Sequence, residues 1–98
     1  MYAVIRRYRF DPADAAEINR RIKDIFVHLL RRTPGFEAYY WLDTAEGEGA
    51  SISVFRDRAG AEQSTHIAGH FVHEHLATLL GTPELIQGEV HARADTHW

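Results

Sequence analysis

The sequence predicts an α+β fold of the ferredoxin-like type, in which two helices cover one face of a four-stranded antiparallel sheet. Its periodic segments run strand, helix, strand, strand, helix, strand, the order of a split βαβ pair. All of them fit within 98 residues, so we expect one domain, residues 1–93, and a loose tail, residues 94–98. Apolar side chains also occur on the face without helices, which indicates a dimeric α+β barrel. The expected strands are Tyr2–Phe10, Phe36–Thr44, Ala50–Arg56 and Leu85–Arg93, and the expected helices are Ala13–Arg32 and Ala59–Leu80.

Composition and charge exclude several classes of function. The net charge is only −3 and the two signs are interspersed, so we expect no nucleic-acid partner and no anionic membrane surface. The absence of cysteine excludes disulfides, thiolate metal sites and cysteine nucleophiles. No apolar run approaches the ~20 residues that span a bilayer, and the N-terminal segment has the pattern of a strand rather than of a signal peptide. We therefore expect a cytoplasmic protein.

The first expected helix has clear start and stop signals. Asp11 is a good N-cap residue, and Pro12 stands where its missing N–H does no harm. The segment 33–35, Thr-Pro-Gly, ends the helix. A stripe with a period of 3.6 residues predicts its buried face, which comprises Ala15, Ile18, Ile22, Ile25, Phe26 and Leu29.

The second and third expected strands carry apolar residues on both faces. In the second strand, Phe36, Ala38, Tyr40 and Leu42 alternate with Glu37, Tyr39, Trp41 and Asp43. In the third strand, Ile52 and Val54 alternate with Ser51, Ser53 and Phe55. We expect Trp41, Ile52 and Val54 to lie on the face without helices and to form a homodimer interface. The alternative is that they are scattered surface residues.

Four of the seven histidines lie in the segment HIAGHFVHEH of the second expected helix. At 100° per residue, His66, His70 and His73 fall on one side, opposite the apolar stripe. Histidines four residues apart on a helix can bind Zn²⁺, but the motif HExxH is absent and no third ligand is recognisable. We therefore expect an exposed polar face and no metal site. The apolar stripe itself comprises Ala61, Ala68, Val72, Leu76 and Leu79.

His75 falls within that apolar stripe. An imidazole on a core-facing stripe must find a hydrogen-bond partner or line a cavity. One interpretation is a structural histidine bonded to a strand. The other is a pocket residue that binds, orients or deprotonates a ligand.

The segments YAVIRRY, PGFEAYY and SVFRDRAGAEQST resemble the antibiotic biosynthesis monooxygenase-like family of dimeric α+β barrels. The resemblance extends from Tyr2 to Ala92. It implies a dimer formed by apposed sheets, with a pocket between each sheet and its own helices. The family includes cofactor-independent monooxygenases, quinol-oxidising members, haem-degrading enzymes and proteins without a known activity.

The same resemblance argues against haem degradation. Haem-degrading members carry an asparagine on the first strand, a tryptophan on the third and a histidine on the second helix. The matching positions are Arg6, Phe55 and His75, so only the histidine is retained.

The resemblance implies oxygenation of an electron-rich aromatic compound, such as a phenol or a quinol, without a cofactor. That chemistry needs a base or hydrogen-bond acceptor for the substrate hydroxyl and a dry cavity. We expect His75 and Arg6 to be the catalytic residues. The expected substrate-binding residues are Tyr8, Tyr40, Ser53, Phe55, Phe71 and Ile22.

Strand parity alone does not decide whether Arg6 or Arg7 faces the pocket, although Arg6 shares the parity of Val4 and Tyr8. An inward arginine implies an acidic partner or an anionic ligand. Two other functions stay open: a protein that binds a ligand without turnover, and a structural module with a filled barrel.

Overall fold

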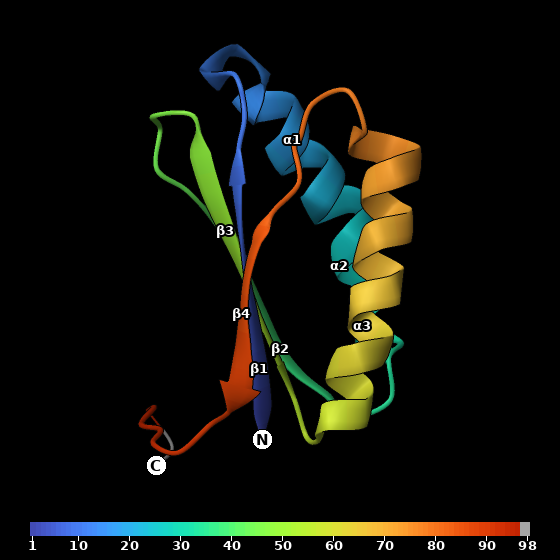
Figure 1. Ribbon diagram of the computed structural model, residues 1–98, viewed down its shortest axis with the longest axis vertical. Helices are drawn as coiled ribbons and strands as arrows, with labels where there is room; N and C mark the ends of the chain where they lie inside the picture. The colour runs from blue at the N-terminus through green and yellow to red at the C-terminus, as the bar shows by residue number, and fades with distance from the viewer. Residues whose placement is uncertain (97–98) are drawn as a thin grey trace.

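The computed structural model describes residues 1–96 and contains the six expected elements in the expected order (Figure 1). The first helix is continuous but changes its hydrogen-bond pattern along its length, and the second changes it near its end. The strands are β1 (Tyr2–Arg9), β2 (Phe36–Asp43), β3 (Glu48–Phe55) and β4 (Glu84–Glu89). The helical segments are η1 (Pro12–Asp14), α1 (Ala15–Arg21), η2 (Ile22–Phe26), α2 (Val27–Arg31), α3 (Arg58–Phe71) and η3 (Val72–Leu76).

The four strands form one antiparallel sheet in the order β2-β3-β1-β4. Both helices cover the same face of this sheet, and Figure 1 shows the other face without a covering layer. The predicted α+β, ferredoxin-like fold is confirmed. The edge strands β2 and β4 therefore form two opposite borders of the helix-covered layer, and the functional site lies within that layer.

The first helix begins as the sequence predicts, because the Asp11 carboxylate accepts a hydrogen bond from the Ala13 backbone N–H at 2.9 Å. Its buried stripe shifts at the end: Leu30 is fully buried, whereas Leu29 is 37% exposed. Of the other predicted residues, Ala15 and Ile25 are only partly buried. The cause of the shift is the π-helical segment η2, in which the Val27 N–H bonds to the Ile22 carbonyl five residues earlier. A π turn is wider than an α turn, so the core positions beyond it move along by one residue.

Glu17 accepts hydrogen bonds from both Arg20 and Arg21 on this helix. These bonds lower the pKa of the Glu17 carboxyl to about 2.

β2 carries a bulge that reverses the predicted orientation of its aromatic residues. Phe36 pairs with Phe55, but the next pair joins Ala38 to Val54, so one extra residue lies between them. Trp41 consequently faces the helices, where its indole N–H donates to the Asn19 side-chain oxygen at 2.7 Å. The prediction that Trp41 lies on the open face is wrong. Ile52 and Val54 do lie there, half-buried.

β4 is shorter than predicted because it ends at Glu89, not at position 93. Glu89 pairs with Tyr2, the first residue of β1, and the Val90 N–H still donates to the Met1 carbonyl at 2.8 Å, so the ladder ends where β1 begins. The expected tail includes residues 97 and 98, which lie outside the described part of the chain. Within residues 1–96, the structure has no helix of the length and hydropathy needed to cross a membrane.

The hydrophobic core lies between the sheet and the two helices. It is built from both layers and includes the fully buried Val4, Ile18, Leu30 and Phe55. On β1 and β3 the faces alternate as the sequence predicts: Arg6, Ser51 and Ser53 point toward the helices and are buried. Arg6 is therefore a charged side chain buried in an otherwise largely apolar layer.

Candidate functional site

An open groove runs between the second helix and the β4 edge of the sheet. Its volume is about 530 Å³, within the range of small-molecule sites. Small residues on the helix, among them Ala68 and Gly69, leave the space unfilled. The groove is lined by Arg6, Tyr8, Thr65, Ala68, Gly69, Val72, His73, Ala77, Leu80, Gly81, Thr82, Pro83 and Leu85.

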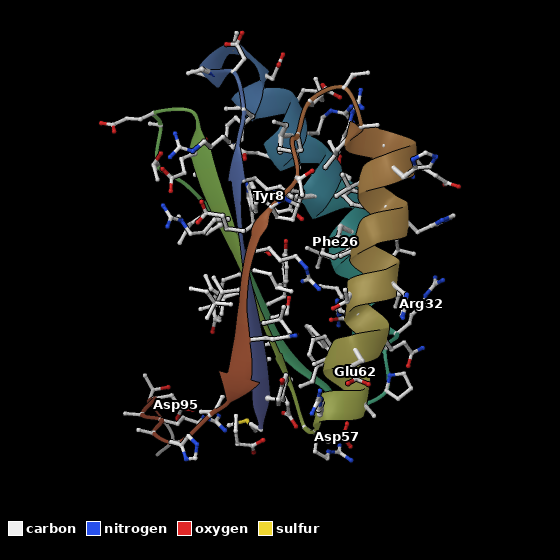
Figure 2. All side chains as sticks on the ribbon, in the orientation of Figure 1. Tyr8, Phe26, Arg32, Asp57, Glu62 and Asp95 are labelled. Carbon is white, nitrogen blue, oxygen red and sulfur yellow. The ribbon has the colours of Figure 1, made fainter. Side chains whose placement is uncertain are left out.

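A small cavity continues from the groove into the core. Its volume is about 20 Å³, which is enough for roughly one water molecule. Tyr8 and Phe26 both lie between the sheet and the helices, as Figure 2 shows. The cavity is lined by Arg6, Tyr8, Ile22, Phe26, Tyr39, Ser51, Ala68, Phe71, Val72, Leu76 and Leu80. Groove and cavity thus share Arg6 and Tyr8, the polar residues at their junction.

The structure places Arg6, not Arg7, in this site. Arg6 is only 4% exposed, whereas Arg7 lies on the other face and pairs with Glu48 at 2.6 Å. Arg6 donates one hydrogen bond, from Nη2 to the Thr65 hydroxyl at 2.9 Å. Within residues 1–96, no carboxylate forms an ion pair with Arg6. Burial consequently lowers the pKa of its guanidinium, although an arginine remains charged at neutral pH.

Two tyrosines stand beside Arg6. Tyr8 lies two residues further along β1, and Tyr39 comes from β2, where the bulge turns it toward the helices. Burial raises the pKa of both phenols, so both are neutral and able to donate a hydrogen bond. Neither hydroxyl has a hydrogen-bond partner in the described part of the chain. The site therefore combines one cation with two unused donors, an arrangement suited to an anionic oxygen.

The two π-helical segments frame the cavity. Ile22 and Phe26 are the first and last residues of η2, and Val72 and Leu76 are the first and last residues of η3. All four line the cavity. π-helical turns are uncommon and are frequent at functional sites. Both helices are therefore distorted where they face Arg6.

Of the eight site residues that the sequence predicts, the structure brings four together at the cavity. These are Arg6, Tyr8, Ile22 and Phe71. Ser53 and Phe55 are fully buried in the core but line neither the cavity nor the groove. Tyr40 lies on the open face of the sheet and is 63% exposed, because the β2 bulge turns it away from the helices.

His75 does not lie where the helical angle predicts. It belongs to η3, and the wider turn rotates it away from the sheet. Its ring packs against Phe71 with centroids 5.2 Å apart, and its side chain is 38% exposed. Its backbone carbonyl accepts a hydrogen bond from Arg21 of the first helix. His75 lines neither the cavity nor the groove, and its catalytic role stays a prediction.

The other three histidines of this helix, His66, His70 and His73, are exposed, as predicted. His73 nevertheless lines the outer part of the groove. Within residues 1–96, the structure shows no cluster of three or more histidines and carboxylates suited to a metal ion.

Sequence reasoning missed Tyr39 and Thr65. It placed Ser51 on the same strand face as Ser53 and Phe55, as the structure has it, but did not select Ser51 as a site residue. Tyr39 could not be placed without the bulge. Thr65 depends on the packing of the second helix over β1, a tertiary feature.

Comparison with known proteins extends these observations. The family profile described as antibiotic biosynthesis monooxygenase matches residues 1–73. A protein of unknown function from Nitrosomonas europaea has a similar structure, with a TM-score of 0.81 and 22% identity, over 95% of this chain and 91% of that one. No curated protein sequence matches the chain significantly.

Two structures of oxygenases also share the fold. A monooxygenase from Streptomyces coelicolor, in complex with nanaomycin D, has a TM-score of 0.76 and 13% identity, over 95% of this chain and 89% of that one. A cofactor-independent oxygenase from Streptomyces nogalater has a TM-score of 0.68 and 18% identity, over 94% of each chain. At these identities the similarity establishes the fold alone.

Proposed function

Because the chain belongs to the antibiotic biosynthesis monooxygenase family, we propose that it oxidises an aromatic hydroxyl compound with dioxygen and without a cofactor. The observation that carries this proposal is the buried Arg6, which has no carboxylate partner within residues 1–96 and opens onto a groove of about 530 Å³. Two relatives of known fold support it, since one is a monooxygenase with a bound small molecule and the other is a cofactor-independent oxygenase.

Arg6 supplies the charge that this chemistry needs. A guanidinium beside a phenol hydroxyl favours the phenolate, whose ring is electron-rich enough to react with dioxygen. The neutral hydroxyls of Tyr8 and Tyr39 can donate to the same oxygen. The groove walls are largely apolar, which strengthens these electrostatic interactions.

The proposed reaction balances without any further reductant. A ring carbon of the phenolate forms a bond to dioxygen, and the resulting hydroperoxide loses water as its O–O bond breaks. One oxygen atom enters the ring to give a quinone, and the other leaves as water with the two hydrogens that the substrate loses. The substrate gives up four electrons, the number that reduces one dioxygen fully.

The test uses 1,5-dihydroxynaphthalene as the probe and measures oxygen uptake together with ¹⁸O₂ incorporation into the quinone. Arg6→Gln should lower kcat/KM by about 10- to 100-fold, because a charge-assisted hydrogen bond is lost. Arg6→Lys should retain part of the activity. Arg32→Gln is the matched control, since Arg32 is exposed and forms no ion pair in the described chain. Prior dialysis against a chelator should leave turnover unchanged.

A spectroscopic readout separates binding from catalysis. The phenol pKa of the bound probe should be lower than its value in water, and Arg6→Gln should abolish the difference. If the probe binds as its phenolate but no oxygen is consumed, the protein is a binding protein and the catalytic proposal fails. If Arg6→Gln changes neither quantity, the assigned role of Arg6 is wrong.

We also propose that the chain forms a homodimer through the open face of the sheet. This face carries exposed apolar side chains, including Tyr40 and Ile86 at 63% exposure and Leu42 at 46%. Ile52 and Val54 lie at its centre. A contiguous apolar patch on a sheet favours burial against a second copy, and a stable interface should bury more than ~1,000 Å².

A further inference from the structure

A second opening lies at the opposite edge of the helix-covered layer from the groove. It is a recess of about 360 Å³ between the first helix and β2, whereas the groove adjoins β4 at the other border of the sheet. The proposed function does not use it. The recess is lined by Asn19, Ile22, Lys23, Val27, Tyr39, Trp41 and Asp43.

The small cavity lies between these two openings. On the groove side it shares Arg6, Tyr8, Ala68, Val72 and Leu80 with the groove. On the other side it shares only Ile22 and Tyr39 with the recess. Two side chains that line both spaces thus separate the cavity from the β2 edge.

Hydrogen bonds hold the outer wall of the recess, but not the partition, by which we mean Ile22 and Tyr39 between the recess and the cavity. The Trp41 indole N–H donates to Asn19 at 2.7 Å, and the Asn19 side-chain N–H donates to Asp43 at 3.2 Å. This hydrogen-bonded chain holds the outer wall in place. Ile22, by contrast, is apolar and begins the π-helical segment η2, and the Tyr39 hydroxyl has no hydrogen-bond partner within residues 1–96. A change of rotamer at either residue breaks no hydrogen bond within the described chain.

We propose that the recess is a second entrance to the cavity, which admits dioxygen past Ile22 and Tyr39 while the groove holds the aromatic substrate. An occupied groove blocks the first route, because the groove opens onto the same Arg6 and Tyr8 that bind the substrate. A neutral diatomic molecule needs only a small side-chain movement, which the apolar Ile22 can make while Tyr39 donates to the substrate, whereas an aromatic molecule needs a much larger opening. The need for dioxygen rests on the proposed function, but its entry is measurable without turnover.

The experiment measures the rate constant for dioxygen quenching of tryptophan phosphorescence inside the cavity. The reporter is Phe71→Trp, because Phe71 lines the cavity and is 3% exposed. Trp41 is kept, since its hydrogen bond to Asn19 holds the recess wall, and the signal of the natural tryptophans is measured separately in the chain without the reporter. Gly69→Phe fills the groove, where a Cβ meets open space. Val27→Phe fills the recess from its half-buried outer wall. Leu29→Phe is the control on the same helix, since it lines neither opening.

With the groove filled, quenching should continue at a similar rate, and the added Val27→Phe should slow it several-fold. Lys23→Phe, at an exposed position of the recess, should have the same effect if Val27→Phe does not fold. In a turnover assay, Val27→Phe should lower kcat/KM for dioxygen and leave the KM for 1,5-dihydroxynaphthalene unchanged.

Two results would overturn the second entrance: loss of quenching when the groove alone is filled, or no slowing when the recess is also filled. Because quenching needs no catalysis, it decides the route even if the protein does not oxidise the naphthalene probe.

Discussion

Replacing Arg6 by methionine should stabilise the protein while it abolishes binding of a phenolate. Arg6 is 4% exposed, and within residues 1–96 its only hydrogen bond goes to the neutral hydroxyl of Thr65. Burying a charged side chain costs several kcal/mol, and one hydrogen bond to a charged group returns about 1.5–3 kcal/mol. Methionine has a similar length and no charge, and the exposed Thr65 can bond to water instead. We therefore expect the free energy of unfolding to rise by about 1–3 kcal/mol.

The assay is urea unfolding followed by far-UV circular dichroism at fixed protein concentration, together with a thermal scan. Since 1 kcal/mol moves the Tm of a domain of this size by about 4–8 °C, Arg6→Met should raise it by at least about 4 °C. Arg32→Met, at an exposed position, should stay within about 0.5 kcal/mol of the wild type. A loss of more than about 1 kcal/mol in Arg6→Met would refute the reasoning. It would mean that Arg6 is satisfied in solution, for instance by water or a bound anion in the groove.

Three further predictions concern the rest of the fold. The Glu17 carboxyl should titrate near pH 2 by NMR. Because its folded pKa lies below the ordinary value of 4.5, its ion pairs stabilise the helix above pH 4.5 and lose that effect as the pH falls to about 2. Gly47→Ala should lower the free energy of unfolding by about 2 kcal/mol or more, since φ is +82° and a Cβ would lie 2.7 Å from a carbonyl oxygen. Gly69→Ala, in a helix with open space around it, should raise the free energy of unfolding by about 0.5–1 kcal/mol. A similar loss at both positions would contradict the geometry. Ile52→Asp should convert a dimer to a monomer in sedimentation experiments, and Gln63→Asp, at an exposed helix position, should not; a wild-type monomer at micromolar concentration would exclude the sheet-to-sheet dimer.

Part of the site was visible in the sequence because strand alternation is a local property. Val4, Arg6 and Tyr8 point to the same face of β1, so the burial of one predicts the burial of the other two. The order of elements and the cap at Asp11 depend in the same way on neighbouring residues alone. These features are determined within a few residues of chain, and the structure confirms them.

The tertiary structure alone decided which aromatic residues of β2 and which histidine face the site. A single bulge after Phe36 turns Tyr39 and Trp41 inward and Tyr40 outward, and the wide turn of η3 rotates His75 away from the sheet. Both irregularities insert about one extra residue into a regular period, and that displacement reverses or rotates every later side chain. A bulge or a π turn is selected by the packing between layers, which no local pattern encodes. The sequence by itself therefore determined the order of the elements and the alternation along β1, and the packing of helices on the sheet decided that Arg6, not Arg7, is the buried cation and what surrounds it.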